Sequence, residues 1–407
     1  MAERPPARLC KGGMVLPPVL AAGEVSVLSA ISTVAAAEWD ALFAHEVELA
    51  SPFVRHAFVS ALEESGSATP ATGWTPRHLL LRREGRLVAA APAWLKEGSE
   101  GDFSRDFEWA GAAERAGVPY YPKLVLGIPA TPATGRRILV AEGEPRGPAV
   151  ARLVEAAREV VRAEEAGGLH VLFTPAGEAL ELERAGLARR VDFQYHWRNQ
   201  GDATMAQFLA RFGSKRRHAI RRELRAPAEQ GVVIRTVRGD ELARDPGGWA
   251  DDCYELHRSS TDQMAWGMRW VNHAFYQLVL SRMPDAVEVV EARHHGRLVG
   301  MAFNLATRTV LYGRYWGGAE HFPFLHFNVA LYHSIDQCLS LGRLRFEGGA
   351  GGEHKLSRGF EPAETWSCHA LSDPRLDAAV RRRLATELPA RLAGVAAWRE
   401  EHPRLGG

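Results

Sequence analysis

The 407-residue sequence lacks long apolar runs and lacks an excess of charge of either sign. No window approaches the roughly 18 consecutive apolar residues that a membrane-spanning helix needs, and the N-terminus has no apolar stretch of signal-peptide length. The formal net charge is +1, so composition alone does not indicate a nucleic-acid or acidic-membrane partner. These absences predict a soluble, cytoplasmic protein without a membrane span, in which any basic surface is local.

Cysteine and lysine are both scarce. The four cysteines are far apart and form no C-x-x-C pair, so neither a zinc site nor a disulfide framework can be identified. The sequence also lacks histidine pairs at metal-ligand helical spacing with a carboxylate, so we expect no metal. Five of the 50 basic residues are lysine, and the others are arginine. Against this bias, a lysine beside glycines is a candidate for a specific role.

The length predicts two or three domains, and an internal repeat favours two. Residues 77–95 and 287–305 each show an alternating apolar run, a turn ending in glycine, the tetrapeptide G-R-L-V and a second apolar run. This is the pattern of a β-hairpin, with Gly85 and Gly296 at turn positions that favour positive φ.

The order of elements after each hairpin repeats as well. Residues 149–165 and 328–341 have helical periodicity, and each stretch is followed by a glycine, a strand-like apolar run and a loop. The chain therefore contains a duplicated α/β (α+β) unit of about 170 residues, a mixed sheet flanked by helices with one βαβ crossover. We expect a flexible tail over residues 1–25, a first domain over 26–200, and a second domain with a C-terminal helix over 201–407.

A basic amphipathic helix is predicted at residues 212–225, F-G-S-K-R-R-H-A-I-R-R-E-L-R. Phe212, Ile220 and Leu224 form its apolar stripe, and Ser214 is the expected N-cap. Cations in the first turn oppose the helix dipole, so this end is a candidate anion site, with a solvated basic face as the alternative. The candidate phosphate-binding or donor-binding residues are Lys215, Arg217, His218, Arg221 and Arg222.

Aromatic residues and glycines follow the second hairpin in T-V-L-Y-G-R-Y-W-G-G-A-E-H-F-P-F-L-H-F-N. Tyrosine and tryptophan carry polar tips on apolar bodies, which suits a substrate groove, although aromatics at a strand end also occur in cores. The candidate substrate-binding residues of this stretch are Tyr312, Arg314, Tyr315, Trp316 and His326.

A glycine cluster, R-F-E-G-G-A-G-G-E-H-K-L-S-R-G-F, occupies residues 345–360. It departs from the P-loop pattern because His354 precedes Lys355 and Leu356 follows it, and it does not open a helix as a dinucleotide fingerprint would. It predicts a flexible passage that brings charged side chains together, with a surface turn of solvated charges as the alternative. Its candidate substrate-binding residues are Glu347, Gly349, Gly351 and Arg358, and its candidate catalytic residues are Glu353, His354 and Lys355.

Several stretches of the sequence together resemble the motifs of one protein family: S-P-F-V-R-H-A-F-V-S-A-L-E-E-S-G-S-A, E-R-A-G-V-P-Y-Y-P-K-L, G-S-K-R-R-H-A-I-R-R-E, L-Y-G-R-Y-W-G, H-F-P-F-L-H-F and the glycine cluster. Over residues 51–369 they resemble the FemAB-like N-acyltransferases of the GNAT superfamily, a bacterial family labelled peptidoglycan biosynthesis or recognition. The resemblance implies two tandem GNAT-like folds. It also implies transfer of an acyl or aminoacyl group to an amine, with acyl-CoA or aminoacyl-tRNA as co-substrate and no permanently bound cofactor.

Such a transfer requires that the amine lose a proton and that the carbonyl oxyanion be stabilised. We expect the glycine cluster and residues 312–316 to face one cleft between the domains, where Lys355 and Arg314 hold a phosphate or carboxylate and Glu353 or His354 is the base. The acceptor is a small-molecule or peptide amine, for example a cell-wall peptide precursor. The alternative is a non-catalytic GNAT-like module that binds a peptidoglycan precursor or nucleic acid. The sequence leaves the donor, with tRNA among the candidates, the acceptor and the oligomeric state open.

Overall fold

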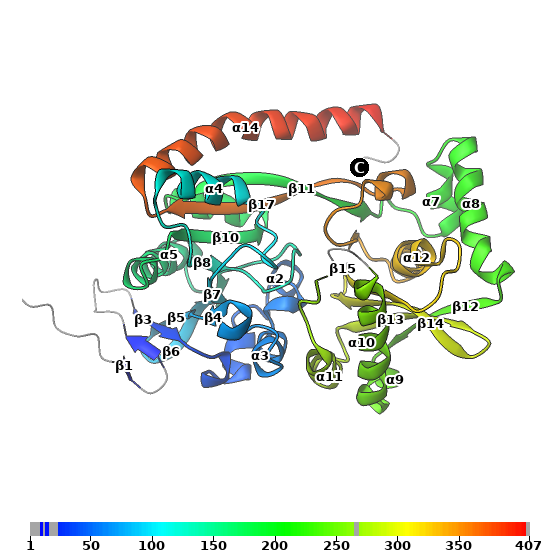
Figure 1. Cartoon of the computed structure of the whole chain (residues 1–407), viewed down its shortest axis with the longest axis horizontal. Coiled ribbons are helices and arrows are strands. Elements are labelled where there is room, and N and C mark those ends of the chain that lie inside the picture. Colours follow the sequence, from blue (N-terminus) through cyan, green and yellow to red (C-terminus); the bar gives the residue numbers. More distant parts are fainter. Residues whose placement is uncertain (1–8, 11–12, 16–22, 264–267, 404–407) are drawn as a thin grey trace, which may run out of the picture. The chain divides into compact units, whose positions relative to one another are not determined.

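The structure is a computed structural model, and it describes residues 9–10, 13–15, 23–263 and 268–403. Contacts divide the chain into two compact units, whose elements are labelled in Figure 1. The first unit combines Met1–Val191 with Thr365–Pro389, and the second combines Asp192–Glu364 with Ala390–Gly407.

This division differs from the domains expected from the sequence. The first break falls after Val191 rather than after residue 200, and Thr365–Pro389 groups with the first unit rather than the second. Strand pairing gives the reason: β17 (Glu361–Leu371) ends alongside β10 (Gly168–Thr174), antiparallel, with Leu371 opposite Gly168. A strand from the C-terminal part of the sequence therefore completes the first unit.

The first unit is built on two sheets. One has the order β1-β2-β3-β5-β6-β9, and the other, within this unit, has the order β17-β10-β8-β7-β4. Residues 1–25, expected as a flexible tail, contain β1, β2 and the start of β3, while 1–8, 11–12 and 16–22 lie outside the described residues. The remaining strands of the unit are β1 (Leu9–Cys10), β2 (Gly13–Val15), β3 (Glu24–Leu28), β4 (Trp74–Pro76), β5 (His78–Arg83), β6 (Arg86–Ala91), β7 (Ala93–Lys96), β8 (Lys123–Leu126) and β9 (Leu139–Val140).

Local sequence explains the central elements of the first unit. The hairpin predicted at residues 77–95 is confirmed, because β5 and β6 pair antiparallel around Glu84 and Gly85, both with positive φ. Pro92 cannot donate to a ladder, and after it the chain continues as β7 in the other sheet. Helix α5 (Arg146–Ala163) joins the parallel strands β8 and β10, which makes the predicted βαβ crossover.

Further helices of the first unit surround these sheets. After β10 the chain enters helix α6 rather than the expected loop, because Pro175 stands at the N-cap, where its fixed φ is compatible with the start of a helix. The helices are η1 (Ile31–Thr33), α1 (Ala36–Ala41), α2 (Val47–Ala50), η2 (Pro52–Val54), α3 (His56–Glu64), η3 (Pro70–Thr72), α4 (Phe107–Ala116) and α6 (Ala176–Arg184). The C-terminal helix α14 (Pro374–Glu401) begins in this unit.

The second unit has one sheet with the order β12-β13-β14-β15-β16-β11. The hairpin predicted at residues 287–305 is confirmed by the antiparallel pairing of β13 and β14 around His295 and Gly296. Strands β15 and β16 are parallel and are joined by helix, the second predicted crossover. The strands are β11 (Ala188–Arg198), β12 (Val232–Arg238), β13 (Val287–His294), β14 (Arg297–Ala306), β15 (Val310–Gly318) and β16 (Arg345–Glu347).

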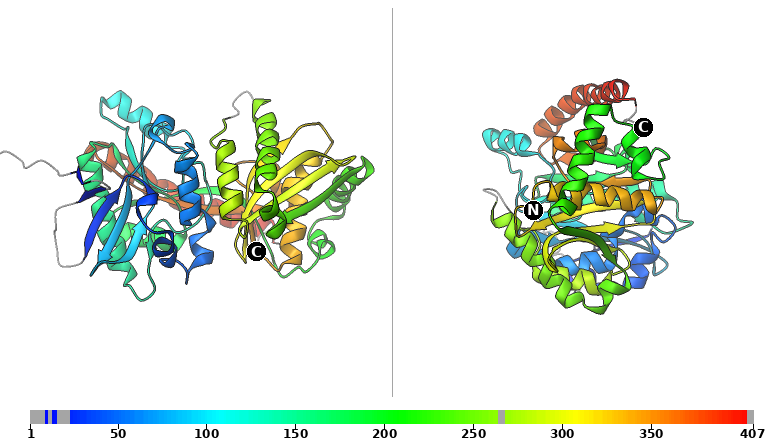
Figure 2. Two further views of the ribbon diagram at one scale, coloured as in Figure 1. Left: turned by 90° about the horizontal axis from the view of Figure 1, so that it is seen from below. Right: turned by 90° about the vertical axis from the view of Figure 1, so that its right-hand side faces the viewer.

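Helices cover both faces of this sheet (Figure 2). Neighbouring residues of β14 point to opposite faces, as strand geometry requires. Ala302 packs with Val329 of the crossover helix, and the Phe303 ring lies 5.0 Å from the Tyr276 ring of α11. The helices are α7 (Met205–Ala210), α8 (Ser214–Glu229), α9 (Asp240–Arg244), α10 (Pro246–Asp262), α11 (His273–Arg282), α12 (Leu325–Phe327), the π-helical η4 (Asn328–Tyr332), α13 (His333–Ser340) and the 3-10 helix η5 (Glu353–Arg358).

Two helix starts differ from the sequence prediction. Helix α8 begins at Ser214, so the N-cap is Gly213, which has no side-chain cap, rather than Ser214. The crossover helix predicted over residues 328–341 begins earlier, at Leu325, because Phe324 takes a left-handed conformation there. The helix contains a π-helical turn, which holds more residues than an α-helical turn.

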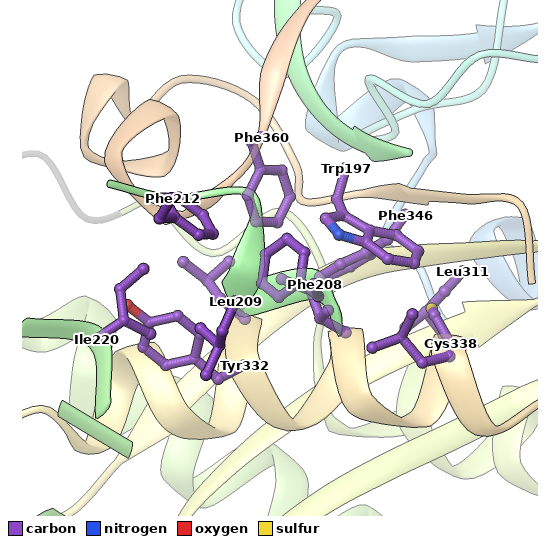
Figure 3. Packing of buried hydrophobic residues seen from close by; sticks show 13 residues of the cluster. Trp197, Phe208, Leu209, Phe212, Ile220, Leu311, Tyr332, Cys338, Phe346 and Phe360 are labelled. Carbon is purple, nitrogen blue, oxygen red and sulfur yellow. The ribbon is translucent and has the colours of Figure 1, made fainter. Parts of the chain in front are cut away.

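Buried aromatic residues anchor the segment that carries the glycine cluster. Figure 3 shows Phe360 packed with Phe208 and Phe212 above the crossover helix. Phe360 follows η5 directly, and the rings of Phe346 and Phe360 lie 5.5 Å apart. Glycine-rich segments have a wide choice of backbone conformations. Residues 348–352 are such a segment, and core residues hold it at both ends.

Candidate functional site

A pocket of about 280 Å³ lies where β15 and β16 separate. The two strands pair in parallel from Val310 opposite Arg345 to Tyr312 opposite Glu347, and beyond this point β16 ends while β15 continues. All lining residues belong to the second unit, so the two segments expected at a cleft between domains meet inside one unit. The lining residues are Ala302, Asn304, Gly313, Arg314, Tyr315, Trp316, His326, Ala330, Leu331, Gly348, Ala350, Gly351, Gly352, His354 and Lys355.

A β-bulge shapes the β15 wall of the pocket. Phe303 stands opposite Tyr315 and Asn304 opposite Gly313, so Arg314 is the extra residue. Bulges re-aim side chains next to sites. The Arg314 guanidinium lies 5.4 Å from the centre of the Tyr315 ring, and the Trp316 and His326 rings lie 5.0 Å apart. One cation and three aromatic rings thus form this side of the pocket.

Lys355 lies on the opposite wall of the pocket, and backbone carbonyls surround its amine. Its Nζ donates hydrogen bonds to the carbonyl oxygens of Gly349, at 3.0 Å, and Gly351, at 2.8 Å. Both glycines have positive φ, which other residues rarely adopt, so the glycines let the carbonyls turn inward. The residue is 6% exposed, and burial lowers the pKa of Lys355 to about 8. The amine can therefore exchange a proton near physiological pH.

Two histidines of the pocket are neutral at pH 7. Burial, together with repulsion from the nearby His354, Lys355 and Arg358, lowers the pKa of His326 to about 4. Burial also lowers the pKa of His354, with added repulsion from Lys355 and Arg358. Their ring centroids are 6.2 Å apart, and His354 is exposed to solvent. A neutral imidazole that reaches both the pocket and water can accept a proton.

A buried ion pair fixes the segment that carries His354 and Lys355. Arg358 lies 3.0 Å from Glu223 of α8, its guanidinium carbon stands 3.4 Å from the centre of the Phe327 ring, and it donates to the His354 carbonyl at 3.0 Å. Glu223 also accepts a 2.6 Å hydrogen bond from the Tyr332 hydroxyl. Helix α8 therefore holds the loop in place through its buried face.

The structure brings together part of the predicted site. His354, Lys355, Arg314, Tyr315, Trp316, His326 and Gly351 line the pocket. Gly349 contributes its carbonyl to Lys355, and Arg358 serves the ion pair with Glu223.

Three other predicted residues lie away from the pocket lining. Glu353 is exposed on η5. Tyr312 is fully buried. Glu347, 2% exposed, stands 3.8 Å from His196 and 3.2 Å from Arg345.

The basic residues of α8 lie outside the pocket lining. Lys215, His218, Arg221 and Arg222 are exposed, and Arg217 is half-buried. Asn304, which is buried in β14 and lines the pocket, is not among the residues predicted from the sequence. An asparagine inside the apolar run M-A-F-N-L was the available signal, but the strand's register was needed to interpret it.

The described residues offer neither a metal-binding cluster nor a membrane-spanning helix. They hold no group of three or more histidine, cysteine, aspartate or glutamate residues that could bind a metal ion. Within the same part of the chain, no helix has the length and apolar character to cross a membrane.

Comparison with solved structures shows the fold. FemX superposes with a TM-score of 0.54 at 11% sequence identity, covering 86% of this chain and 98% of FemX. The C-terminal domain of a proposed lysylphosphatidylglycerol synthetase from Agrobacterium fabrum gives 0.53 at 13% identity, covering 87% and 97%. A tandem GNAT protein from the clavulanic acid biosynthesis pathway gives 0.40 at 17% identity, covering 86% and 99%. The expected fold class, α/β with mixed sheets flanked by helices, is confirmed.

Comparison with protein families supports the resemblance seen in the sequence. No curated protein matches the chain. The model of the FemAB-like family, described as peptidoglycan biosynthesis/recognition, matches residues 30–404. The chain therefore belongs to the FemAB-like family.

Proposed function

We propose that the protein is an N-acyltransferase that moves an acyl or aminoacyl group onto an amine in the pocket between β15 and β16. The observation that carries this proposal is a buried lysine amine, with a pKa near 8, beside two neutral imidazoles. These groups can take a proton from an incoming amine and return one to a leaving group near pH 7. FemAB-like membership supports the same reaction class.

The pocket residues fit the steps of such a transfer. His354 accepts a proton from the acceptor amine, because it is neutral and reaches both solvent and the pocket. The neutral amine nitrogen bonds to the carbonyl carbon as this proton leaves, and Arg314 stabilises the negative oxygen. The bond from carbon to the leaving sulfur or oxygen breaks, and the Lys355 ammonium supplies the leaving group's proton. Glu353, the other base predicted from the sequence, is a weaker candidate, because it lies outside the lining.

Substrate classes follow from the family and from charge. The family description supports a peptidoglycan precursor peptide as the acceptor. The donor is an acyl-CoA or an aminoacyl-tRNA, both of which carry phosphates. The exposed cations of α8 provide a surface for such phosphates, and binding through them weakens as salt rises.

The test is a transfer assay with purified protein. Acyl-CoA and aminoacyl-tRNA are each supplied with uridine-nucleotide muropeptides, and mass spectrometry detects the acylated amine. His354→Gln lowers turnover at least about a hundredfold, while His295→Gln, at an exposed hairpin tip, leaves it unchanged. Thermal stabilisation by these compounds without any product from the wild type would instead identify a non-catalytic binding module.

A further inference from the structure

Asn304 is a buried polar side chain with an unused hydrogen-bonding group. It lies on β14, is 1% exposed and lines the pocket between β15 and β16. Its carboxamide nitrogen has no hydrogen-bond partner among the described residues. Buried amides are almost always paired, so a native structure that leaves one unpaired carries a cost in stability.

A second buried asparagine shows the usual arrangement. Asn328, 4% exposed, lies on the crossover helix of the same unit. Its nitrogen donates to the carbonyl oxygens of Glu223 at 2.8 Å and Phe324 at 2.9 Å. The backbone of the protein thus accepts the hydrogen bonds of the Asn328 carboxamide, whereas the Asn304 carboxamide nitrogen can donate to another partner.

The strand geometry explains why a ligand can supply that partner. Asn304 stands opposite Gly313, where the missing Cβ makes room for the Phe346 ring, and the bulge at Arg314 follows directly. Ala302, two residues earlier on the same face of β14, also lines the pocket. Rotation of the carboxamide exchanges its oxygen and nitrogen, so the donor can turn toward the pocket without moving the backbone.

We propose that Asn304 is a specificity-determining residue whose carboxamide donates a hydrogen bond to a carbonyl oxygen of the substrate. This rests on the proposed function for the identity of the pocket. Two substrates of an acyl transfer carry such a group: the acyl donor, in its ester or thioester, and a peptide acceptor, in its amide. The hydrogen-bonding chemistry is shared, and the experiment below separates the two sources.

The first measurement compares Asn304→Leu with Asn328→Leu by thermal unfolding of the full chain. Leucine branches at Cγ as asparagine does and needs no hydrogen bond. Asn304→Leu keeps or raises Tm, because it removes an unpaired group, whereas Asn328→Leu lowers Tm by exposing two carbonyls to an apolar neighbour. If Asn304→Leu lowers Tm as much as Asn328→Leu, the residue has a structural role and the proposal fails.

The second measurement is ligand affinity, which does not depend on turnover. The probes are acetyl-CoA with CoA as its control lacking the acyl carbonyl, and N-acetyl-lysine methylamide with pentylamine as its control lacking amides. In Asn304→Leu, the affinity for one carbonyl probe falls about tenfold, and the affinity for its control stays the same. The probe that loses affinity identifies the source of the carbonyl.

Two results overturn the proposal: a wild type that prefers neither carbonyl probe over its control, or a preference that survives in Asn304→Leu. Failure of the proposed function has a different signature. In that case the wild type binds a carbonyl probe through Asn304 but forms no acylated product.

Discussion

Two buried lysines, Lys123 in the first unit and Lys355 in the second, have opposite surroundings. Lys123 is 0% exposed, and its amine lies 2.7 Å from Asp102, 2.5 Å from Asp106 and 2.7 Å from the Ser99 hydroxyl. The amine of Lys355 contacts two backbone carbonyls, and of the described residues no carboxylate pairs with it. In the first unit the lysine amine lies between two carboxyl groups; in the second it can lose its proton.

The neighbours of Lys123 support this contrast. Burial alone would raise the pKa of Asp106, but the charge of Lys123 holds it well below its usual range. Burial, together with repulsion from Lys123, lowers the pKa of His170 to about 3. The charge of Lys123 thus opposes the cost of burying Asp106, and His170 stays neutral at physiological pH, which suits a structural role. A chain that almost always uses arginine has lysine at both sites, since each suits a slim ammonium rather than a planar guanidinium.

The strongest test of the contrast is Lys123→Met. The substitution leaves Asp102 and Asp106 buried without their cation, so we expect the free energy of unfolding to fall by about 3–5 kcal/mol. Urea denaturation followed by circular dichroism measures this. Lys215→Met, on the exposed face of α8, is the matched control and changes stability by less than about 0.5 kcal/mol. A loss below about 1 kcal/mol would show that the two carboxyl groups do not depend on Lys123, and the contrast with Lys355 would fail.

The pH dependence of stability tests whether the pKa of Lys355 is lowered. The pKa of Lys355 is lowered from 10.5 to about 8, so between these values the unfolded chain holds a proton that the folded chain has released. Stability from this residue therefore rises as pH increases from about 8 to 10.5, by about 3 kcal/mol. Lys355→Met removes this rise, and the difference between wild-type and variant stability at pH 7 and 10 isolates it from other titrating groups. Parallel stability curves for the two proteins would show that Lys355 keeps an ordinary pKa.

Turnover by Lys355→Met shows whether the amine takes part in chemistry. We expect a loss of about a hundredfold, equivalent to about 2.7 kcal/mol in the barrier, because the leaving group loses its proton donor. The measurement is the rate of transfer under saturating substrate, with stability checked at pH 7, where a folded variant is expected. Full activity in the folded variant would mean that Lys355 only shapes the loop, as Lys123 shapes its cluster.

No carboxylate pairs with Lys355 among the described residues, and its loop is held instead by the ion pair of Arg358 with Glu223. Glu223→Gln tests the contribution of this ion pair to stability. Glutamine keeps a hydrogen bond to Tyr332 but removes the negative charge opposite Arg358, so we expect a loss of about 1–2 kcal/mol in stability. Glu229→Gln, on the same helix and exposed, costs less than about 0.5 kcal/mol. Equal effects of the two substitutions would show that the pair between Glu223 and Arg358 contributes little.

Sequence patterns predicted the elements that depend on neighbouring residues. The two hairpins and the crossover helices follow from glycine turns and from apolar periodicity, and both are local properties. The motifs also placed His354, Lys355 and Arg314 in one candidate site, and the structure puts all three in one pocket. His354 and Lys355 follow a glycine cluster, and Arg314 lies among the aromatic residues of β15.

What remained hidden depends on distant pairing. The bulge at Arg314 and the register of β14 decide that Asn304 reaches the pocket, and a single strand does not encode its partner. Arg358 looked like a substrate ligand because its partner, Glu223, lies 135 residues away in the sequence. The grouping of Thr365–Pro389 with the first unit has the same cause, since it depends on which strand β17 meets.

The pairing of β17 with β10 also bears on how the protein is made. Residues 168–174 leave the ribosome long before residues 366–371, which complete their ladder. At about 5–20 residues per second, the nascent first unit waits on the order of ten seconds or more with an open strand edge. The second unit is synthesised during this wait. A chaperone that covers β10 would protect the nascent chain, and release from a ribosome stalled after residue 200 would yield an aggregation-prone fragment.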